Sequence, residues 1–314
     1  MGQKQAGCTG LHVSDVCSSL TIDFLIAPAH IPPFDATRMA AAVGARFALE
    51  FYKIQLFPGR RMDQHPMSVN VNTAIRWNVI RNLPFMKSLS GKKVCDLGAG
   101  LGFFSVGFAK RGANVTAVDV DKDALDYLSR TYKIDVLQRD VEKDALGLSD
   151  YDVVFIGEIL EHIQDPSMLI AKSADALKTN GLLVLSTPAL EGLLIHSEGK
   201  QLAHTHGSEK HERDGFTESE LKELLKNSGF EITYSQFTIF LFAELFMQIT
   251  KRAYMKSKKA YHSQSDVLAV TRTFKYRVLK LIFPLLMMLF RAEEFMSLAM
   301  GLKGHCHILV GRKL

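Results

Sequence analysis

The sequence predicts an α/β protein with a seven-stranded, doubly wound sheet, N-terminal helices, and a helical insertion between the sixth and seventh strands. Three observations support this fold class. From Lys92 onward, short valine-rich apolar runs alternate with amphipathic stretches, which is typical of βαβ units in a parallel sheet. A glycine turn at residues 98–102 follows the first of these runs. The chain has 314 residues and is 47% hydrophobic, which is enough for one large domain with appended helices.

The N-terminal part of the chain is expected to lie outside the sheet. Residues 1–36 mix Gly, Ser, Cys and Pro without a clear period, which predicts a disordered tail. Residues 37–90 are expected to be largely helical, with one helix over 37–57 that ends at a Pro-Gly pair and another over 71–82.

The predicted core domain comprises residues 91–237 together with 305–314. Its strands are expected at 93–97, 114–119, 134–138, 152–156, 181–187, 230–237 and 306–312. Helices are expected at 103–110 and 218–228, and Thr217 with Glu220 forms a capping-box pattern at the start of the second. In such sheets ligands bind at the carboxyl ends of the strands, so the site residues are expected there.

Residues 238–304 form the predicted insertion, which combines apolar runs with basic residues. The runs at 237–247 and 281–290 are each shorter than the ~20 residues that a bilayer-spanning helix needs. Between them, residues 251–280 contain nine lysines and arginines against one acid, Asp266. This pattern predicts contact with an anionic membrane surface. The alternative is an extra helical layer packed on the sheet with a solvated basic face.

Charge and cysteine content exclude several other classes. The formal net charge of +5 is small for a nucleic-acid binder, and no aromatic RNA motif is present, so no nucleic acid is expected as a partner. The four cysteines form no CxxC pair, which argues against a zinc site built from cysteines or a disulfide framework.

Asp15 and Asp23 interrupt the N-terminal apolar stretch, so a secretory signal is not expected. We therefore expect a cytoplasmic protein with peripheral membrane association; the sequence indicates no oligomeric state.

The first predicted strand runs into a tight turn with Gly98, Gly100 and Gly102. Glycines permit positive φ and let a ligand approach the backbone closely. A dinucleotide site would read GxGxxG or GxGxxA, and Phe103 breaks that pattern. Asp96, two residues before Gly98, is an acceptor suited to a cationic amine or a bound water, where a phosphate would be repelled. These features indicate S-adenosylmethionine, which carries an amine and no phosphate, over a merely structural glycine turn.

Two further acids follow the next two strands. Asp119 ends its strand 21 positions after Gly98, where a carboxylate can accept both hydroxyls of a ribose. Asp140 and Val141 follow the third strand and are placed to bind adenine, the carboxylate taking the amino group and the Val141 N–H a ring nitrogen. A solvated acidic loop is the alternative for Asp140.

These residues resemble class I S-adenosylmethionine-dependent methyltransferases, which have a Rossmann-like sheet, and most closely the ubiquinone-biosynthesis O-methyltransferase family. The likeness covers about residues 71–230 and is carried by the motifs at 92–98, 111–119, 151–154 and 157–166. The sequence departs from the family at Ala99, where a cysteine is common, upstream of Arg76, where an Asn-Pro pair is missing, and beyond Phe237.

The resemblance implies roles for four residues. Arg76 would reach the methionine carboxylate of the cofactor, and Gly98 would lie at its amino acid end. Asp119 would bind the ribose, and Gly157 would line the methionine side of the pocket.

The candidate catalytic residues follow the fourth strand. Glu158, Glu161 and His162 have the spacing i, i+3 and i+4, so on a helix they would share one face. Two carboxylates and an imidazole suit Mg²⁺ or Zn²⁺. The alternatives are His162 as a plain general base, and a structural cap or pocket wall. His211 lies in a histidine-rich segment that the resemblance places over the acceptor, which makes it a second candidate base.

Together these features predict an O-methyltransferase for a lipophilic acceptor, such as a quinol, a phenol or a lipid headgroup, reached from a membrane surface. One alternative is a soluble small-molecule methyltransferase whose insertion forms a substrate lid. Another is a non-catalytic membrane-associated scaffold.

Overall fold

The computed structural model describes residues 65–194, 212–255 and 274–314. The chain divides into two compact units, Met1–Arg46 and Phe47–Leu314, and all described residues belong to the second. The predicted tail at 1–36 and the predicted helix at 37–57 lie outside the described residues.

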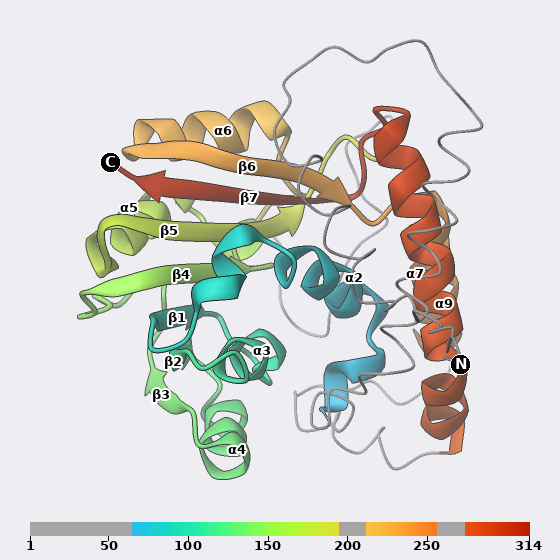
Figure 1. Ribbon diagram of the computed structural model, residues 1–314, viewed down its shortest axis with the longest axis horizontal. Helices are drawn as coiled ribbons and strands as arrows, with labels where there is room; N and C mark the ends of the chain where they lie inside the picture. The colour runs from blue at the N-terminus through green and yellow to red at the C-terminus, as the bar shows by residue number, and fades with distance from the viewer. Residues whose placement is uncertain (1–64, 195–211, 256–273) are drawn as a thin grey trace, which may run out of the picture. The chain divides into compact units, whose positions relative to one another are not determined.

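Seven strands form one sheet in the order β3-β2-β1-β4-β5-β7-β6 (Figure 1). The strands are β1 (Lys93–Leu97), β2 (Asn114–Asp119), β3 (Asp135–Gln138), β4 (Tyr151–Gly157), β5 (Leu177–Pro188), β6 (Phe230–Thr238) and β7 (Cys306–Lys313). Each predicted strand is confirmed, although β5 begins earlier than expected. The order reverses direction after β1, as in other doubly wound sheets, and the predicted Rossmann-like fold is confirmed.

The expectation of a parallel sheet is wrong at β7, which runs antiparallel to both β5 and β6. Thr238, the last residue of β6, pairs with Cys306, the first residue of β7. The insertion therefore leaves and re-enters the sheet at the same edge, so β7 has to run back beside β6. Cys306 also pairs with Pro188 at the end of β5, which places the insertion at the carboxyl edge of the parallel strands.

Helices cover both faces of the sheet. They are α2 (Val71–Ile80), α3 (Phe103–Ala109), α4 (Lys122–Tyr132), α5 (Pro166–Ala176) and α6 (Glu218–Asn227), with short 3₁₀ turns η2 (Pro66–Val69), η3 (Pro84–Ser88) and η4 (Leu160–His162). The capping box is confirmed, because the Thr217 side chain accepts from the Glu220 N–H while the Glu220 carboxylate accepts from the Thr217 N–H. Such a cap stabilises a helix by ~1 kcal/mol.

The core has two halves, because successive residues of a strand point to opposite faces. On one face Phe155 packs in a cluster with residues of α2, α3 and α4, including Trp77 and Phe108. On the other face Ile156 packs in a cluster with residues of α5 and α6, including Leu169.

The insertion contains the helices α7 (Leu241–Met255) and α9 (Phe274–Ala299), which confirms its predicted helical character. In Figure 1 both helices stand beyond the arrowheads of β5 and β6. Phe283 and Phe290 of α9 are buried in a third cluster together with Val71 and Ile75 of α2. Glu293 of α9 accepts the N–H groups at the start of α7, including that of Ala243 at 3.1 Å. Within the described part of the chain, no helix is both long and apolar enough to cross a membrane.

Candidate active site

The glycine turn lies between β1 and α3 and has a backbone that only glycine adopts easily. Gly98, Gly100 and Gly102 have φ of 69°, 53° and 72°, in the left-handed region. A Cβ atom on Gly98 would lie 2.2 Å from the Ile159 side chain, and one on Gly102 would lie 2.2 Å from Leu128. The turn is therefore fixed by both its conformation and its packing.

Asp119 ends β2 beside this turn. Its Oδ2 accepts the Gly100 N–H at 2.7 Å and its Oδ1 accepts the Asp121 N–H at 2.8 Å. The side chain is 9% exposed. Each carboxylate oxygen has a second lone pair, so the two oxygens can also accept the two ribose hydroxyls predicted for this position.

Asp96 on β1 is buried, and it accepts a hydrogen bond from the Ser105 hydroxyl at 2.5 Å. Burial raises the pKa of this carboxyl to about 7. The sequence predicted an acceptor for an amine or a water here, and it did not predict Ser105 as a partner. The contact joins β1 to α3 directly beneath the glycine turn.

Asp140 and Val141 follow β3, as predicted. Asp140 accepts the Lys143 ammonium at 2.8 Å and the Glu142 N–H at 3.0 Å, and the hydrogen bond from Lys143 holds its pKa below the usual value. The Val141 carbonyl accepts from the Lys172 ammonium at 3.0 Å. The described contacts of Asp140 thus order a turn, and its role toward adenine stays a prediction.

Arg76 projects from α2 to the end of β4 and is 5% exposed. Its Nη1 lies 3.5 Å from Glu158 Oε1 and 3.4 Å from Ser186 Oγ. The Asn72 side chain, one turn earlier on α2, donates to Glu158 Oε2 at 3.0 Å. Two helical residues and the residue after β4 thus form one polar cluster.

Two buried atoms of this cluster have no hydrogen-bond partner among the described residues: Arg76 Nε, a donor, and Asn72 Oδ1, an acceptor. Unpaired buried polar groups are costly, and in folded proteins they mark missing partners. The methionine end of S-adenosylmethionine carries a carboxylate for the donor and an ammonium for the acceptor. The residues at this position fit that group.

The chain turns sharply after β4. Glu158 has φ of 58°, in the left-handed region, and Ile159 is also outside the helical range. Only Leu160–His162 form a helical turn, η4. The condition for a shared helical face, that Glu158, Glu161 and His162 lie on one helix, is therefore not met. Across residues 65–194, 212–255 and 274–314, no group of three His, Cys, Asp or Glu residues is placed to hold a metal ion.

Gly157 is the last residue of β4, and its role at the methionine side of the cofactor pocket stays a prediction. A Cβ atom there would lie 2.8 Å from the Phe155 ring and 3.6 Å from Arg76 Nη1. The absence of a side chain thus leaves space beside the guanidinium group.

Glu161 is almost fully buried and accepts from the Thr187 hydroxyl at 3.3 Å. Burial, and then the neighbouring Glu158 charge, raise its pKa well above the usual value. Its backbone carbonyl accepts the N–H groups of Glu212 and Arg213 at 3.0 and 3.2 Å. His211 itself lies outside the described residues, but the residue that follows it is fixed at η4.

Sequence reasoning missed four polar residues of this region: Asn72, Ser186, Thr187 and Cys306. Asn72 precedes Arg76 by four positions on a helix, and this spacing indicates a shared face. Ser186 and Thr187 interrupt an apolar strand at its carboxyl end, which is a second usable signal. Cys306 carries no local signal, because only the pairing of β7 with β5 brings its thiol within 3.5 Å of Ser186.

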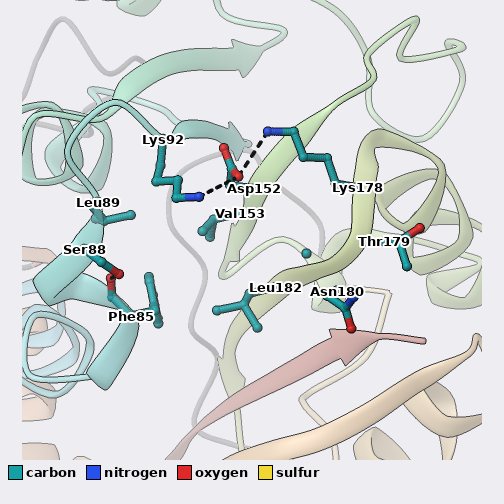
Figure 2. Close-up of a pocket in the computed structure, with 11 residues that line it drawn as sticks. Phe85, Ser88, Leu89, Lys92, Asp152, Val153, Lys178, Thr179, Asn180 and Leu182 are labelled. Atoms are coloured by element: carbon teal, nitrogen blue, oxygen red, sulfur yellow. Dashed lines mark hydrogen bonds and ion pairs between the residues drawn. The ribbon is translucent and has the colours of Figure 1, made fainter.

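A pocket of about 310 Å³ lies at the opposite edge of the sheet (Figure 2). It is lined by residues before β1 and at the beginnings of β4 and β5. Asp152 forms ion pairs there with Lys92 at 3.2 Å and Lys178 at 3.1 Å. Because the glycine turn follows the carboxyl end of β1, this pocket is separate from the predicted cofactor site.

Comparisons with known proteins agree with the geometry. A family model for the methyltransferase domain matches residues 70–235. The ubiquinone biosynthesis O-methyltransferase of Marinobacter nauticus is 38% identical over 108 residues, which cover 32% of this chain and 45% of that protein. The protein of the same name from Dechloromonas aromatica is 39% identical over 106 residues, or 32% and 46% of the two chains. The matches thus span less than half the length of these relatives.

A crystal structure of an S-adenosylmethionine-dependent methyltransferase from Mesorhizobium loti has a TM-score of 0.48 and 19% identity, over 77% of this chain and 100% of that chain. The cluster of Asn72, Arg76 and Glu158, the glycine turn and Asp119 all lie inside the range that the family model matches. The chain therefore belongs to the methyltransferase-domain family, whose cofactor is S-adenosylmethionine.

Proposed function

We propose that this protein transfers the methyl group of S-adenosylmethionine to an oxygen atom of a lipophilic acceptor, such as a quinol, a phenol or a lipid, at a membrane surface. Binding of the methyl donor is supported by one observation. Arg76 Nε and Asn72 Oδ1, in the buried cluster beside the glycine turn, have no hydrogen-bond partner among the described residues. The names of the relatives, ubiquinone biosynthesis O-methyltransferases, support an oxygen acceptor.

The donor-side residues bind and orient the cofactor. Arg76 would hold its carboxylate, Asn72 would accept from its ammonium, and Asp119 would accept from its ribose. The cofactor supplies an electrophilic methyl group on a sulfonium centre. Because displacement at such a centre needs in-line geometry, the rigid turn at Gly98 contributes to the rate by fixing position.

The acceptor-side residues include the general base that removes the hydroxyl proton of the acceptor. An ordinary phenol has a pKa of ~10, so its hydroxyl becomes a better nucleophile when a base removes the proton. His162 lies on η4 directly after β4 and is partly exposed, which suits a general base at the pocket mouth. Glu161 is buried, which raises its pKa, and it accepts from the Thr187 hydroxyl, so we assign it a supporting role beside His162. His211 remains the second candidate base.

One observation favours a second candidate, a methyltransferase for soluble acceptors with a helical lid. The helices α7 and α9 pack on α2 through the cluster around Phe283 and Phe290, at the edge of the sheet where the site lies. In this alternative the insertion covers the acceptor and has no contact with lipid.

The two candidates differ in where the methyl group goes. The purified chain is incubated with methyl-labelled S-adenosylmethionine and a total lipid extract, and the organic phase is analysed by mass spectrometry. We expect a species heavier than its precursor by one methylene plus the isotope label, and much less of it with Asp119→Ala at the same cofactor concentration. Transfer only to water-soluble compounds would favour the lid alternative, and cofactor binding without any transfer would contradict the proposed activity.

A further inference from the structure

An apolar stripe runs along one exposed side of α9. We define the α9 stripe as Val278, Leu281, Ile282, Leu285 and Leu289, whose side chains are 44%, 82%, 45%, 59% and 55% exposed. At 100° per residue these five positions fall within an arc of about 100°. The stripe therefore lies along one side of the helix, both before and after Pro284.

The packing of α9 on the rest of the chain does not explain why this exposed side of the helix is apolar. The opposite side of the helix carries Phe283 and Phe290, which are buried against α2 and α7. A helix that packs on a domain normally presents a polar outer face. Here both faces are apolar, and contiguous exposed apolar surface of this kind marks an interaction site.

The neighbouring helix α7 adds a similar, shorter row. Phe242, Leu245 and Ile249 are 61%, 44% and 56% exposed and follow the spacing i, i+3 and i+7. The two helices contact each other through Phe246 and Phe290, whose ring centroids are 5.5 Å apart. The insertion thus exposes apolar residues on both of its described helices.

The charges next to the stripe identify its partner. Arg277 and Lys280 are exposed on the turn where the stripe begins, and residues 251–280 carry nine basic residues against one acid. Residues 281–290 contain no charged side chain. A second copy of the chain would bring like charges together, which is unfavourable, whereas an anionic bilayer offers an apolar layer beneath negative headgroups.

We infer that the α9 stripe inserts into the surface of an anionic lipid bilayer, with α9 lying in the interfacial plane and Arg277 and Lys280 at the headgroups. The inference rests on the proposed function and names the lipid partner of the same site. α9 packs on Val71 and Ile75 of α2, and the same helix holds Asn72 and Arg76 at the donor site. The bilayer would thus lie one helix away from Asn72 and Arg76.

Flotation of the full chain with vesicles tests this assignment. Vesicles of phosphatidylcholine alone are compared with vesicles that also contain phosphatidylglycerol, at low and high salt. We expect binding to the anionic vesicles that weakens with salt. Leu281→Glu and Leu285→Glu should each lower the partition coefficient by roughly tenfold or more, because each removes a buried aliphatic side chain from the bound state. Leu314→Glu, which changes a leucine that is 75% exposed at the C-terminus, is the matched control.

Two results would overturn the inference. The first is a wild-type chain that does not float with anionic vesicles, or variants of Leu281 and Leu314 that float equally well. The second is evidence that protein covers the stripe: a lower melting temperature or a dissociated dimer for Leu281→Glu, with no change for Leu314→Glu. Calorimetry with S-adenosylmethionine on the same samples separates the two proposals. Intact cofactor binding without flotation contradicts the membrane contact and leaves the methyl transfer standing, whereas flotation without cofactor binding contradicts the methyl transfer and leaves the membrane contact standing.

Discussion

The donor side and the acceptor side of the site are built in different ways. One part of the donor side, the left-handed glycines and the Asp119 carboxylate that accepts backbone N–H groups, lies within residues 96–121. Its other part is the cluster of Asn72 and Arg76 on α2 with Glu158 after β4. The acceptor side, as proposed, combines η4, the end of β5, the start of β7 and the insertion, which are far apart in the sequence. The ribose-binding part of the donor side is thus encoded locally, whereas its methionine-binding part and the proposed acceptor surface depend on tertiary structure. Variants on the two sides should therefore have different effects.

The largest effect is expected on the acceptor side, from His162→Ala. Loss of a general base should lower kcat by a factor of about 100 to 10⁴ with little change in cofactor affinity. Steady-state kinetics with a phenolic acceptor, combined with calorimetry, measure both quantities. A kcat near that of wild type would remove His162 from the mechanism and leave His211 as the candidate base.

Asp119→Ala should have the largest effect on donor binding. The variant loses an acceptor of two backbone N–H groups and of the ribose hydroxyls, so S-adenosylmethionine should bind about 100-fold more weakly. Calorimetric titration gives the affinity, and Asp126→Ala on the surface of α4 is the control. Equal affinities for the two variants would show that Asp119 only supports the turn.

Lower pH should reduce the stability of the fold through protonation of His65, which contacts the glycine turn at Leu101. The buried imidazole contacts the Leu101 carbonyl at 3.0 Å and accepts the Met67 N–H, and burial lowers its pKa to about 4. The folded state therefore binds this proton less tightly than the unfolded state, and stability is lost as pH falls from 6.5 toward 4. At pH 5 the loss relative to neutral pH should be about 2 kcal/mol.

Denaturant unfolding of wild type and His65→Gln at pH 7 and pH 5 measures this contribution. His307, whose pKa is also lowered to about 4 by burial, adds a loss of the same sign, and Asp96, with a raised pKa, adds the opposite sign. Only the difference between the two proteins isolates His65. The same acid sensitivity in both would contradict the assignment.

Arg76→Lys should have the smallest effect of the series. The lysine keeps a positive charge near Glu158 but lacks the Nε donor, so cofactor affinity should fall about tenfold, the equivalent of one hydrogen bond to a charged group. Arg81→Lys at the exposed end of α2 is the control. A lower melting temperature with unchanged affinity would instead make Arg76 a structural residue.

The sequence was sufficient for features that depend on neighbouring residues. The valine-rich runs located the strands, and residues 96–102 and the Thr217–Glu220 cap were correctly placed. The sequence was insufficient where a single backbone conformation, or pairing with a strand distant in the sequence, determines the structure. The left-handed backbone at Glu158 prevents a helix from running from Glu158 to His162. The direction of β7 follows from the insertion, which leaves the sheet and returns to it at the same edge.

Calorimetric titration of the full chain with S-adenosylmethionine tests the central claim most directly. The geometry of Arg76, Asn72 and Asp119 predicts saturable binding to one site, which Asp119→Ala weakens strongly and Asp126→Ala leaves unchanged. A folded wild-type chain that shows no binding to S-adenosylmethionine would contradict the account.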